Sequence, residues 1–377
     1  MKERFSKIDK PLLISSLVLF IFGLIMIFSA SSMESYMRFN YSPYHYFFRQ
    51  MIFLFIGGIG FIITVLFPTK NYKKLDKLLL LIAIISLGGL LVYGYAANNA
   101  ASWYKIGPIT IQPSEFTKII LIIYMAVYYD KNRKNLDNQW VIIKPILFAI
   151  IIVALIAIEP DLGTGIIIML IALMIFYAVP IDKKNRSIFN RIFIGGIAIV
   201  VLLLLTAGTR LLKSYQLERF NFIDPCERYQ EESGYQLCNS LIAFKNGGIT
   251  GKGLGHSTQK YLYLPESYTD FIFAIVVEEW GLIVGIVILL MYLLILFRII
   301  KIARRANNLR NSLIAYGLFC YILIHIMINL LGITGLMPLT GVPLPFLSYG
   351  GSYAICMMIA MGLIQRVSIE SYKKEIK

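Results

Sequence analysis

Charged residues are scarce in this chain, and their scarcity excludes an ordinary soluble domain. Asp, Glu, Lys and Arg make up 15% of the 377 residues, whereas hydrophobic residues make up 58%. The mean hydropathy is +0.72. Soluble domains carry about 25% charged residues, so the composition predicts an integral membrane protein.

Cysteine and histidine are also scarce, with four and three residues. No spacing among them is typical of a zinc site, and no Ser–His–Asp order is visible. Cys320 and Cys356 lie within apolar runs, where we expect them to pack. Cys226 and Cys238 share a polar segment predicted to lie outside the cell. We expect free thiols there, with a disulfide bond as the alternative.

Ten apolar runs are candidates to cross a membrane, which takes about 20 residues of helix. The first run leads into Ser29-Ala30-Ser31, which resembles a signal-peptide cleavage site. Its apolar core exceeds the roughly 7–15 residues of a signal peptide, so we interpret it as a helix. The runs cover residues 11–29, 47–67, 76–95, 114–129, 143–158, 163–180, 190–208, 270–297, 311–333 and 350–366.

The basic residues alternate between the gaps. Of the 36 Lys and Arg residues, 25 fall at the two termini and in every second gap. By the positive-inside rule, both termini are cytoplasmic. The net charge of +15 is therefore a topology signal, and we expect no nucleic-acid binding. The sequence predicts one all-α membrane domain over residues 1–377, with ten transmembrane helices and a large extracellular loop, about residues 209–269, between the seventh and eighth.

The gaps predicted to lie outside carry nearly all the unusual residues. Asp270 opens the eighth run, and Glu278 and Glu279 follow about two turns deeper. Ionisable groups are costly in hydrocarbon and therefore mark functional sites. We take Asp270 as the catalytic candidate and Glu278 as a substrate-binding candidate.

A second group lies where the fourth run begins. Pro113 and Ser114 are typical of a helix start, with Ser114 as the N-cap. Glu115 and Lys118 then share one helix face at i, i+3. Either they form an ion pair that holds neighbouring helices together, or Lys118 binds an anionic head group that Glu115 helps to orient.

Other outer candidates have equally plausible structural roles. Arg49 follows four aromatic residues and suits either a ligand site or an anchor at the membrane interface. The stretch from Glu159 to Gly165 contains Asp161 and suits either binding or a tight turn. The Pro- and Gly-rich gap from Gly335 to Ser352, which contains Ser348, suits a re-entrant turn or a ligand contact.

The predicted outer loop has three parts. Arg210, Lys213 and Arg219 supply cations near its start. Residues 234–244 form a short amphipathic helix that we expect at the membrane surface. Five glycines between 247 and 255 leave the backbone free to fold tightly or to approach a ligand.

Together these motifs resemble the SEDS family, the shape, elongation, division and sporulation proteins of bacteria. The resemblance covers essentially the whole chain, in a specific order of motifs. These are Gln112-Pro113-Ser114-Glu115, Pro160-Asp161-Leu162-Gly163-Thr164, Leu264-Pro265-Glu266, Thr269-Asp270-Phe271-Ile272-Phe273, Glu278-Glu279 and Pro343-Leu344-Pro345-Phe346-Leu347-Ser348-Tyr349-Gly350-Gly351.

The resemblance implies ten membrane helices and a peptidoglycan glycosyltransferase that acts on lipid II at the outer leaflet. The essential aspartate of the family falls on Asp270 and its outer-loop tryptophan on Trp103. Its polar cavity residues fall on Arg49, Glu115, Lys118, Asp161 and Ser348. The runs at 234–240 and 247–255 resemble the division branch more than the elongation branch.

The chain departs from the family pattern in two places. Glu266-Ser267-Tyr268 stands where a typical member has Glu-Ala-His, so the acid–base role falls to Asp270. Trp280 stands where a smaller residue is usual, which we interpret as packing.

We hypothesise that Asp270 takes the proton from the acceptor sugar hydroxyl, in an inverting reaction. Arg49, Lys118 and Arg210 or Arg219 would stabilise the undecaprenyl pyrophosphate leaving group, and Trp103 would pack against a sugar. A divalent cation such as Mg²⁺ could assist, although no acidic cluster requires one.

A lipid flippase and a scaffold of the division complex are the alternatives. The resemblance further implies a class B penicillin-binding protein transpeptidase and other divisome proteins as partners, and a place in the bacterial plasma membrane at the septum.

Overall fold

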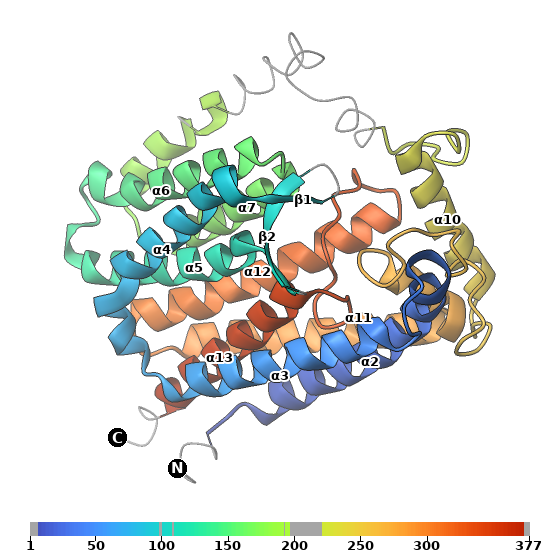
Figure 1. The fold of residues 1–377 in the computed structure, drawn as a ribbon. Coiled ribbons are helices and arrows are strands. Elements are labelled where there is room, and N and C mark those ends of the chain that lie inside the picture. The colour runs from blue at the N-terminus through green and yellow to red at the C-terminus, as the bar shows by residue number, and fades with distance from the viewer. Residues whose placement is uncertain (1–6, 98–99, 108, 192, 197–220, 373–377) are drawn as a thin grey trace.

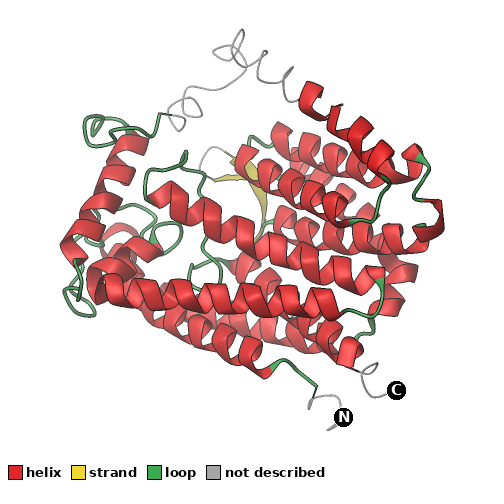
Figure 2. Ribbon diagram, turned by 180° about the vertical axis from the view of Figure 1, so that it is seen from behind, coloured by secondary structure: helices red, strands yellow, loops and turns green. Residues whose placement is uncertain are grey.

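Long helices make up most of the structure, because buried apolar runs leave backbone groups that only intrahelical hydrogen bonds satisfy. The computed structural model describes residues 7–97, 100–107, 109–191, 193–196 and 221–372. Most of the helices lie roughly parallel to one another in a bundle, and α10 stands across their direction at one side (Figure 1; Figure 2). They are α2 (Lys10–Phe39), α3 (His45–Leu66), α4 (Tyr72–Tyr93), α5 (Pro113–Lys131), α6 (Gln139–Ile158), α7 (Leu162–Ala178), α10 (Glu232–Gly247), α11 (Ile272–Arg305), α12 (Leu309–Ile333) and α13 (Gly351–Tyr372), with 3₁₀ turns η1 (Thr69–Asn71) and η2 (Arg133–Asn135).

Nine of the ten predicted runs coincide with helices, namely α2 to α7 and α11 to α13. Seven helices of the described residues are long and apolar enough to cross a membrane, and α7 is a shorter apolar helix. The remaining run, 190–208, lies largely outside the described residues, although residues 183–191 and 193–196 are helical. The chain is a multi-pass membrane protein.

The prediction of an all-α fold was wrong between α4 and α5. Three short strands, β1 (Tyr95–Ala97), β2 (Ala100–Ile106) and β3 (Ile109–Ile111), form an antiparallel sheet in that order. Gly107, with a φ of +62°, lies in the turn before β3. The Tyr104 hydroxyl donates to the Ser86 carbonyl of α4 at 2.8 Å, which ties the sheet to the bundle.

Helices α12 and α13 form the buried centre. Helix α12 packs against α5, α7, α11 and α13, and α13 packs against α3. Glycines allow close contact between α3 and α13: a Cβ at Gly57 would lie 3.0 Å from the Met358 side chain, and one at Gly362 would lie 2.7 Å from the Phe61 carbonyl. These two helices therefore pack with little space between their backbones.

The bundle has two distinct ends. The start of α2 and the last part of α13 meet at one of them, called here the terminal end, where the Asp9 amide donates to the Gln365 side chain at 2.8 Å. The opposite end, the loop end, carries α10 and the segment leading into α11 (Figure 1). Asp9 pairs with Arg298 near the terminal end, and Ser29 bonds Glu279 near the loop end, so α2 and α11 run side by side in opposite directions.

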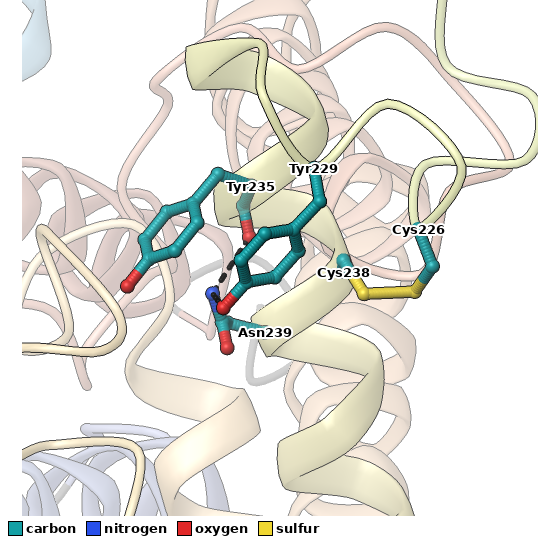
Figure 3. The surroundings of a disulfide bond; sticks show 5 residues. All are labelled: Cys226, Tyr229, Tyr235, Cys238 and Asn239. Atoms are coloured by element: carbon teal, nitrogen blue, oxygen red, sulfur yellow. Dashed lines mark hydrogen bonds between the residues drawn. A yellow bond between two sulfur atoms is a disulfide. The ribbon is translucent and has the colours of Figure 1, made fainter.

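The predicted amphipathic helix is α10, which packs against α11. The expectation of free thiols beside it was wrong, because Cys226 and Cys238 form a disulfide bond (Figure 3). Asn239 lies nearby, and its amide donates to the Tyr235 carbonyl at 2.9 Å and to the Tyr229 hydroxyl at 3.4 Å. The 12-residue separation leaves the two cysteines close once α10 forms, a relationship that spacing alone did not reveal.

Two predicted helix starts require correction. Gln112 is the N-cap of α5 rather than Ser114, since Pro113, which fits the first helical position, already opens the helix. Helix α11 begins at Ile272, two residues after Asp270, and its backbone is non-helical at Gly281. Asp270 therefore lies in the turn before the helix rather than on it.

Candidate functional site

Asp270 borders a small hollow at the loop end of α12. The Asn329 amide donates to the Asp270 carbonyl at 2.7 Å and to the Val342 carbonyl at 2.8 Å, which joins α12 to both flanking segments. A Cβ at Gly341, whose φ is +69°, would lie 3.3 Å from a carboxylate oxygen of Asp270. The half-buried carboxylate thus has close backbone neighbours. The hollow is lined by Asp270, Ile328, Asn329, Gly332, Ile333, Leu339, Thr340, Gly341 and Val342.

Ser348 fixes the backbone just before Asp270. Its hydroxyl donates to the Thr269 carbonyl at 2.6 Å and accepts from the Leu344 amide at 2.8 Å. The Tyr349 amide donates to the Tyr268 carbonyl at 2.9 Å. Ser348 is buried, so these contacts support a positioning role, and direct substrate binding by Ser348 stays a prediction.

A buried ion pair lies one helix layer away, on α5. The Lys118 ammonium donates to a Glu115 carboxylate oxygen at 2.8 Å, and both side chains are buried, with Lys118 only 1% exposed. The same ammonium lies 3.0 Å from the Nε2 atom of His325 on α12. The structure therefore contains the predicted ion pair on α5. Lys118 connects α5 to α12 through His325, a residue that the sequence pattern did not identify.

The buried ion pair and Asp270 are connected through α12. His325 and Asn329 are four residues apart and share a helix face. His325 contacts Lys118, whereas Asn329 holds the Asp270 backbone. One face of α12 therefore joins the cation of α5 to the turn that carries the candidate base.

Asp161 and Glu159 occupy the turn between α6 and α7. Asp161 is the N-cap of α7, where one carboxylate oxygen accepts from the Thr164 amide at 3.1 Å and the other from the Gln112 side chain at 3.4 Å. A Cβ at Gly163 would lie 3.3 Å from the Thr340 carbonyl, so this turn touches the segment that lines the hollow. These contacts support the tight-turn interpretation of Asp161, and substrate binding by Asp161 stays a prediction.

Glu159 is the more unusual acid of this turn. It is 2% exposed, and neither carboxylate oxygen has a hydrogen-bond partner among the described residues. Burial and the neighbouring Asp161 carboxylate raise the pKa of Glu159 to about 8. Perturbed acids in such surroundings are typical of functional sites. The sequence analysis noticed the two acids but did not select Glu159, because burial is not visible in the sequence.

Glu278 and Glu279 hold the glycine-rich loop instead of facing the hollow. Glu278 accepts from the Thr258 hydroxyl at 2.8 Å and from the Lys252 ammonium at 3.1 Å. Glu279 accepts from Lys260 at 2.9 Å and from Ser29 at 2.7 Å. Both glutamates are buried, so these contacts support a role in loop placement, and substrate binding by Glu278 stays a prediction.

Arg49 and Trp103 do not line the hollow. Arg49 is half-buried on α3, with its guanidinium 6.0 Å from the Phe53 ring centre. Trp103 is half-buried on β2, opposite Tyr95. Arg210 and Arg219 lie outside the described residues. No group of three or more metal-binding side chains occurs among the residues that the structure describes.

Asn329 is a further residue that the sequence did not single out. Its side-chain oxygen is buried without a partner among the described residues, while its amide nitrogen makes two bonds. Asn329 also lines the hollow. An amide oxygen in this position could accept a hydroxyl hydrogen from a ligand. In the sequence, the only sign that Asn329 belongs to the site is that it is a polar residue within the apolar run 311–333.

Residues 10–373 match the profile of a family described as cell cycle proteins, which groups FtsW, RodA and SpoVE. A probable peptidoglycan glycosyltransferase FtsW of Bacillus subtilis is 36% identical over 374 residues, covering 98% of this chain and 92% of the relative. Stage V sporulation protein E of the same organism is 38% identical over 371 residues, covering 96% of each chain.

Two solved structures share the fold. A chain from a peptidoglycan synthase complex that coordinates polymerization and crosslinking aligns with a TM-score of 0.75 and 23% identity, covering 97% of this chain and 99% of that one. The rod shape determining protein RodA of Thermus thermophilus aligns with a TM-score of 0.68 and 21% identity, covering 97% and 98%. The arrangement of helices is therefore one already seen in proteins of this kind.

Proposed function

The chain belongs to the FtsW, RodA and SpoVE family of cell cycle proteins, and we propose that it is a peptidoglycan glycosyltransferase that polymerises lipid II into β-1,4-linked glycan strands. The observation that carries this proposal is the position of Asp270, half-buried beside a hollow and joined through α12 to the buried Lys118. A carboxylate near a fixed cation suits proton abstraction next to a developing negative charge.

In the proposed reaction, Asp270 accepts the proton of the 4-hydroxyl of the acceptor N-acetylglucosamine. The freed oxygen attacks the anomeric carbon of the glycan carried on undecaprenyl pyrophosphate. The new glycosidic bond forms as the bond to the pyrophosphate oxygen breaks, with inversion at carbon, and the pyrophosphate leaves with the electron pair. A positioned base contributes typically 10²–10⁴-fold to such a step.

The leaving pyrophosphate needs positive charge nearby. Arg49 and Arg210 are the proposed direct contacts, and Trp103 the proposed sugar contact. Lys118 is buried and already bonded to Glu115 and His325. Its proposed contribution is therefore a positive potential at the floor of the site, which a low-dielectric interior strengthens. A divalent cation such as Mg²⁺ on the pyrophosphate is compatible with this arrangement.

We further propose ten membrane crossings within a single domain, with both termini in the cytoplasm and Asp270 at the outer face. The charge pattern supports this, because the basic segments lie at the terminal end. The positions of Ala178 and α10 also support it. The Asn185 amide bonds the Asp137 carbonyl near the start of α6, whereas α10 lies at the loop end. Because the end of α7 and the start of α10 lie at opposite ends of the bundle, we propose an odd number of membrane crossings between them, which makes the total number of crossings even.

The proposed partner is a class B penicillin-binding protein transpeptidase, and the proposed setting is the division septum, together with other divisome proteins. The peptidoglycan synthase complex that contains a similar chain supports the partner. Similar FtsW proteins support division over elongation. The elongation-type polymerase is the alternative, since RodA shares the fold.

A polymerisation assay tests the function. The purified full chain in detergent, with lipid II and with or without the transpeptidase, should produce glycan polymer. A flippase would produce none under any of these conditions, because translocation has no meaning in detergent. Absence of polymer with the partner present would refute the proposed activity.

A further inference from the structure

The terminal end of the bundle contains a cavity rich in positive charge. It has a volume of about 250 Å³ and lies between the N-terminal segment, the end of α11 and the end of α13. The cavity therefore lies at the opposite end of the bundle from Asp270, which is at the loop end. The charged residues of its lining are Lys7, Asp9, Lys10, Arg298, Lys301 and Arg305.

Charge in this cavity is unbalanced. Five cations line it, and the only acid in its lining is Asp9, which pairs with Arg298. Lys7, Lys10, Lys301 and Arg305 have no ion pair with any residue that the structure describes. Four positive charges therefore share one concave space, which favours an anion.

Some other cations at the same end are neutralised by neighbouring acids. Lys73 pairs with Asp130 at 2.7 Å, and Lys131 pairs with Asp76 at 2.7 Å. Arg366 pairs with Glu370 at 2.8 Å. Lys70, Lys74 and Lys77 also have no ion pair with a described residue but do not line the cavity, so what distinguishes the set around Arg298 is that its cations share one concave space.

The backbone beneath the cavity is held in place. The Asp9 amide donates to the Gln365 side-chain oxygen at 2.8 Å, and the Gln365 amide donates back to the Asp9 carbonyl at 3.0 Å. The Asp9 carboxylate also caps α2 by accepting from the Leu12 amide at 3.1 Å. Lys7 and Lys10 therefore flank a fixed residue, so the site is partly organised before a ligand binds.

Apolar surface continues from the cavity along the same helix faces. Ile14 lies four residues after Lys10 on α2 and is 59% exposed. Phe297 lies four residues before Lys301 on α11 and is 61% exposed. Residues four apart share a face, so each lysine has an exposed apolar side chain directly along its helix toward the membrane interior.

We propose that this cavity binds the phosphate group of an anionic phospholipid, whose acyl chains lie along the exposed faces of α2 and α11. The cations supply the phosphate contacts, and basic pockets between helix ends suit such head groups. The apolar continuation favours a lipid over a free phosphate or a nucleotide. The ligand would join the N-terminal segment, α11 and α13 at one point.

The test compares the full-length protein with two triple variants. Lys10→Gln/Lys301→Gln/Arg305→Gln removes three cations and leaves the Asp9–Arg298 pair intact. Lys70→Gln/Lys74→Gln/Lys77→Gln is the matched control, since it removes the same charge from exposed, unpaired lysines at the same end. Native mass spectrometry in detergent measures binding of phosphatidylglycerol, with phosphatidylcholine as the neutral comparison.

We expect wild type and the control to bind phosphatidylglycerol at least tenfold more tightly than the cavity variant, and phosphatidylcholine weakly in all three. Phosphatidylglycerol should also raise the melting temperature of wild type and the control only. Equal phosphatidylglycerol binding by both triple variants would overturn the proposal. Displacement of the lipid by millimolar inorganic phosphate would also overturn it, because the site would then recognise a free anion.

Discussion

The Lys118 ammonium lies 3.0 Å from Nε2 of His325, and this contact determines how the histidine is protonated. Nδ1 of His325 lies 2.8 Å from the Tyr321 carbonyl, which can only accept. Nδ1 therefore carries the hydrogen, and Nε2 offers its lone pair to the ammonium. A neutral histidine next to a lysine thus stabilises the buried cation that Glu115 neutralises.

Replacing Lys118 by Met should both destabilise the protein and abolish polymerisation. The Glu115 carboxylate would remain buried without its cation, and removing one partner of a buried pair costs about 3–5 kcal/mol. Thermal unfolding in detergent measures the stability, and the lipid II assay measures the activity.

The double variant Glu115→Gln/Lys118→Met separates the two effects. It removes both charges, so most of the stability should return. Activity should stay at least 100-fold below wild type if the positive potential serves the reaction. Recovery of activity along with stability would leave the pair only a structural role.

Asp270→Asn should preserve the fold and remove glycan synthesis. The amide has nearly the same shape but cannot accept the proton of the acceptor hydroxyl, so a loss of about 10²–10⁴-fold is expected. Polymer yield from lipid II is the measurement, with the melting temperature as the check on folding. Glu232→Gln, at an exposed carboxylate in the first turn of α10, is the control and should stay active. Near-normal polymerisation by Asp270→Asn would refute the assignment of the base.

The stability of the protein should fall with rising pH partly because of Glu159. Its pKa is raised from 4.5 to about 8 by burial and Asp161. The folded state therefore holds a proton that the unfolded state releases, and this contribution is complete below pH 4.5 and lost as pH rises through about 8. Glu159→Gln cannot lose that proton. The drop in melting temperature between pH 6 and pH 9 should be smaller in the variant, and parallel curves would show that Glu159 does not titrate in this range.

Gly281 should tolerate no side chain. Its φ is +80°, and a Cβ there would lie 2.3 Å from the Ile249 carbonyl and 2.5 Å from the Gly251 amide. The Leu282 and Ile283 amides bond the Gly248 and Ile249 carbonyls at the same place, so Gly281→Ala should separate the glycine-rich loop from α11. We expect a lower melting temperature and lower activity. Gly88→Ala, where a Cβ would have no neighbour within 4 Å, should leave both almost unchanged. Equal behaviour of the two variants would contradict the close contact at Gly281.

Loss of the Cys226–Cys238 disulfide should lower stability. The bond closes a short loop, and a 15-residue loop corresponds to roughly 3 kcal/mol in the chain-entropy view. Cys226→Ser/Cys238→Ser should melt at a lower temperature than wild type, and reductant should lower the melting temperature of wild type but not of the variant. Two titratable thiols in untreated wild-type protein, outside the buried Cys320 and Cys356, would argue against the bond.

Much of the fold was predictable because hydrophobic length is a local signal. Nine of the described helices follow apolar runs that can be identified in the sequence. The sheet at Tyr95–Ile111 was missed, since its strands are short and two of them contain only three residues. The break at Gly281 was missed as well, because the loop that requires it is more than 20 residues away in the chain.

The site was predictable only in part. Glu115 and Lys118 were paired correctly because their spacing places them on one face of a helix. His325 and Asn329 went unnoticed, since each is a single polar residue in an apolar run whose partner comes from another helix. Substrate binding by Glu278 stays a prediction, and its bonds to Lys252 and Thr258 were not foreseen because they depend on how a distant loop folds back. Local periodicity identifies faces of helices, whereas contacts between distant segments need the tertiary arrangement.

The close fit of α3 on α13 has a structural consequence. With glycines at Gly57 and Gly362, side chains and backbone of each helix fill the space that a Cβ of the other would need. Helix α13 begins only three residues after Ser348, whose hydroxyl donates a hydrogen bond to the carbonyl of Thr269, the residue before Asp270. Contacts therefore run without a break from α3 through α13 to the segment before Asp270, so a partner bound on the exposed flank of α3 would lie on the same chain of packed elements as the proposed base.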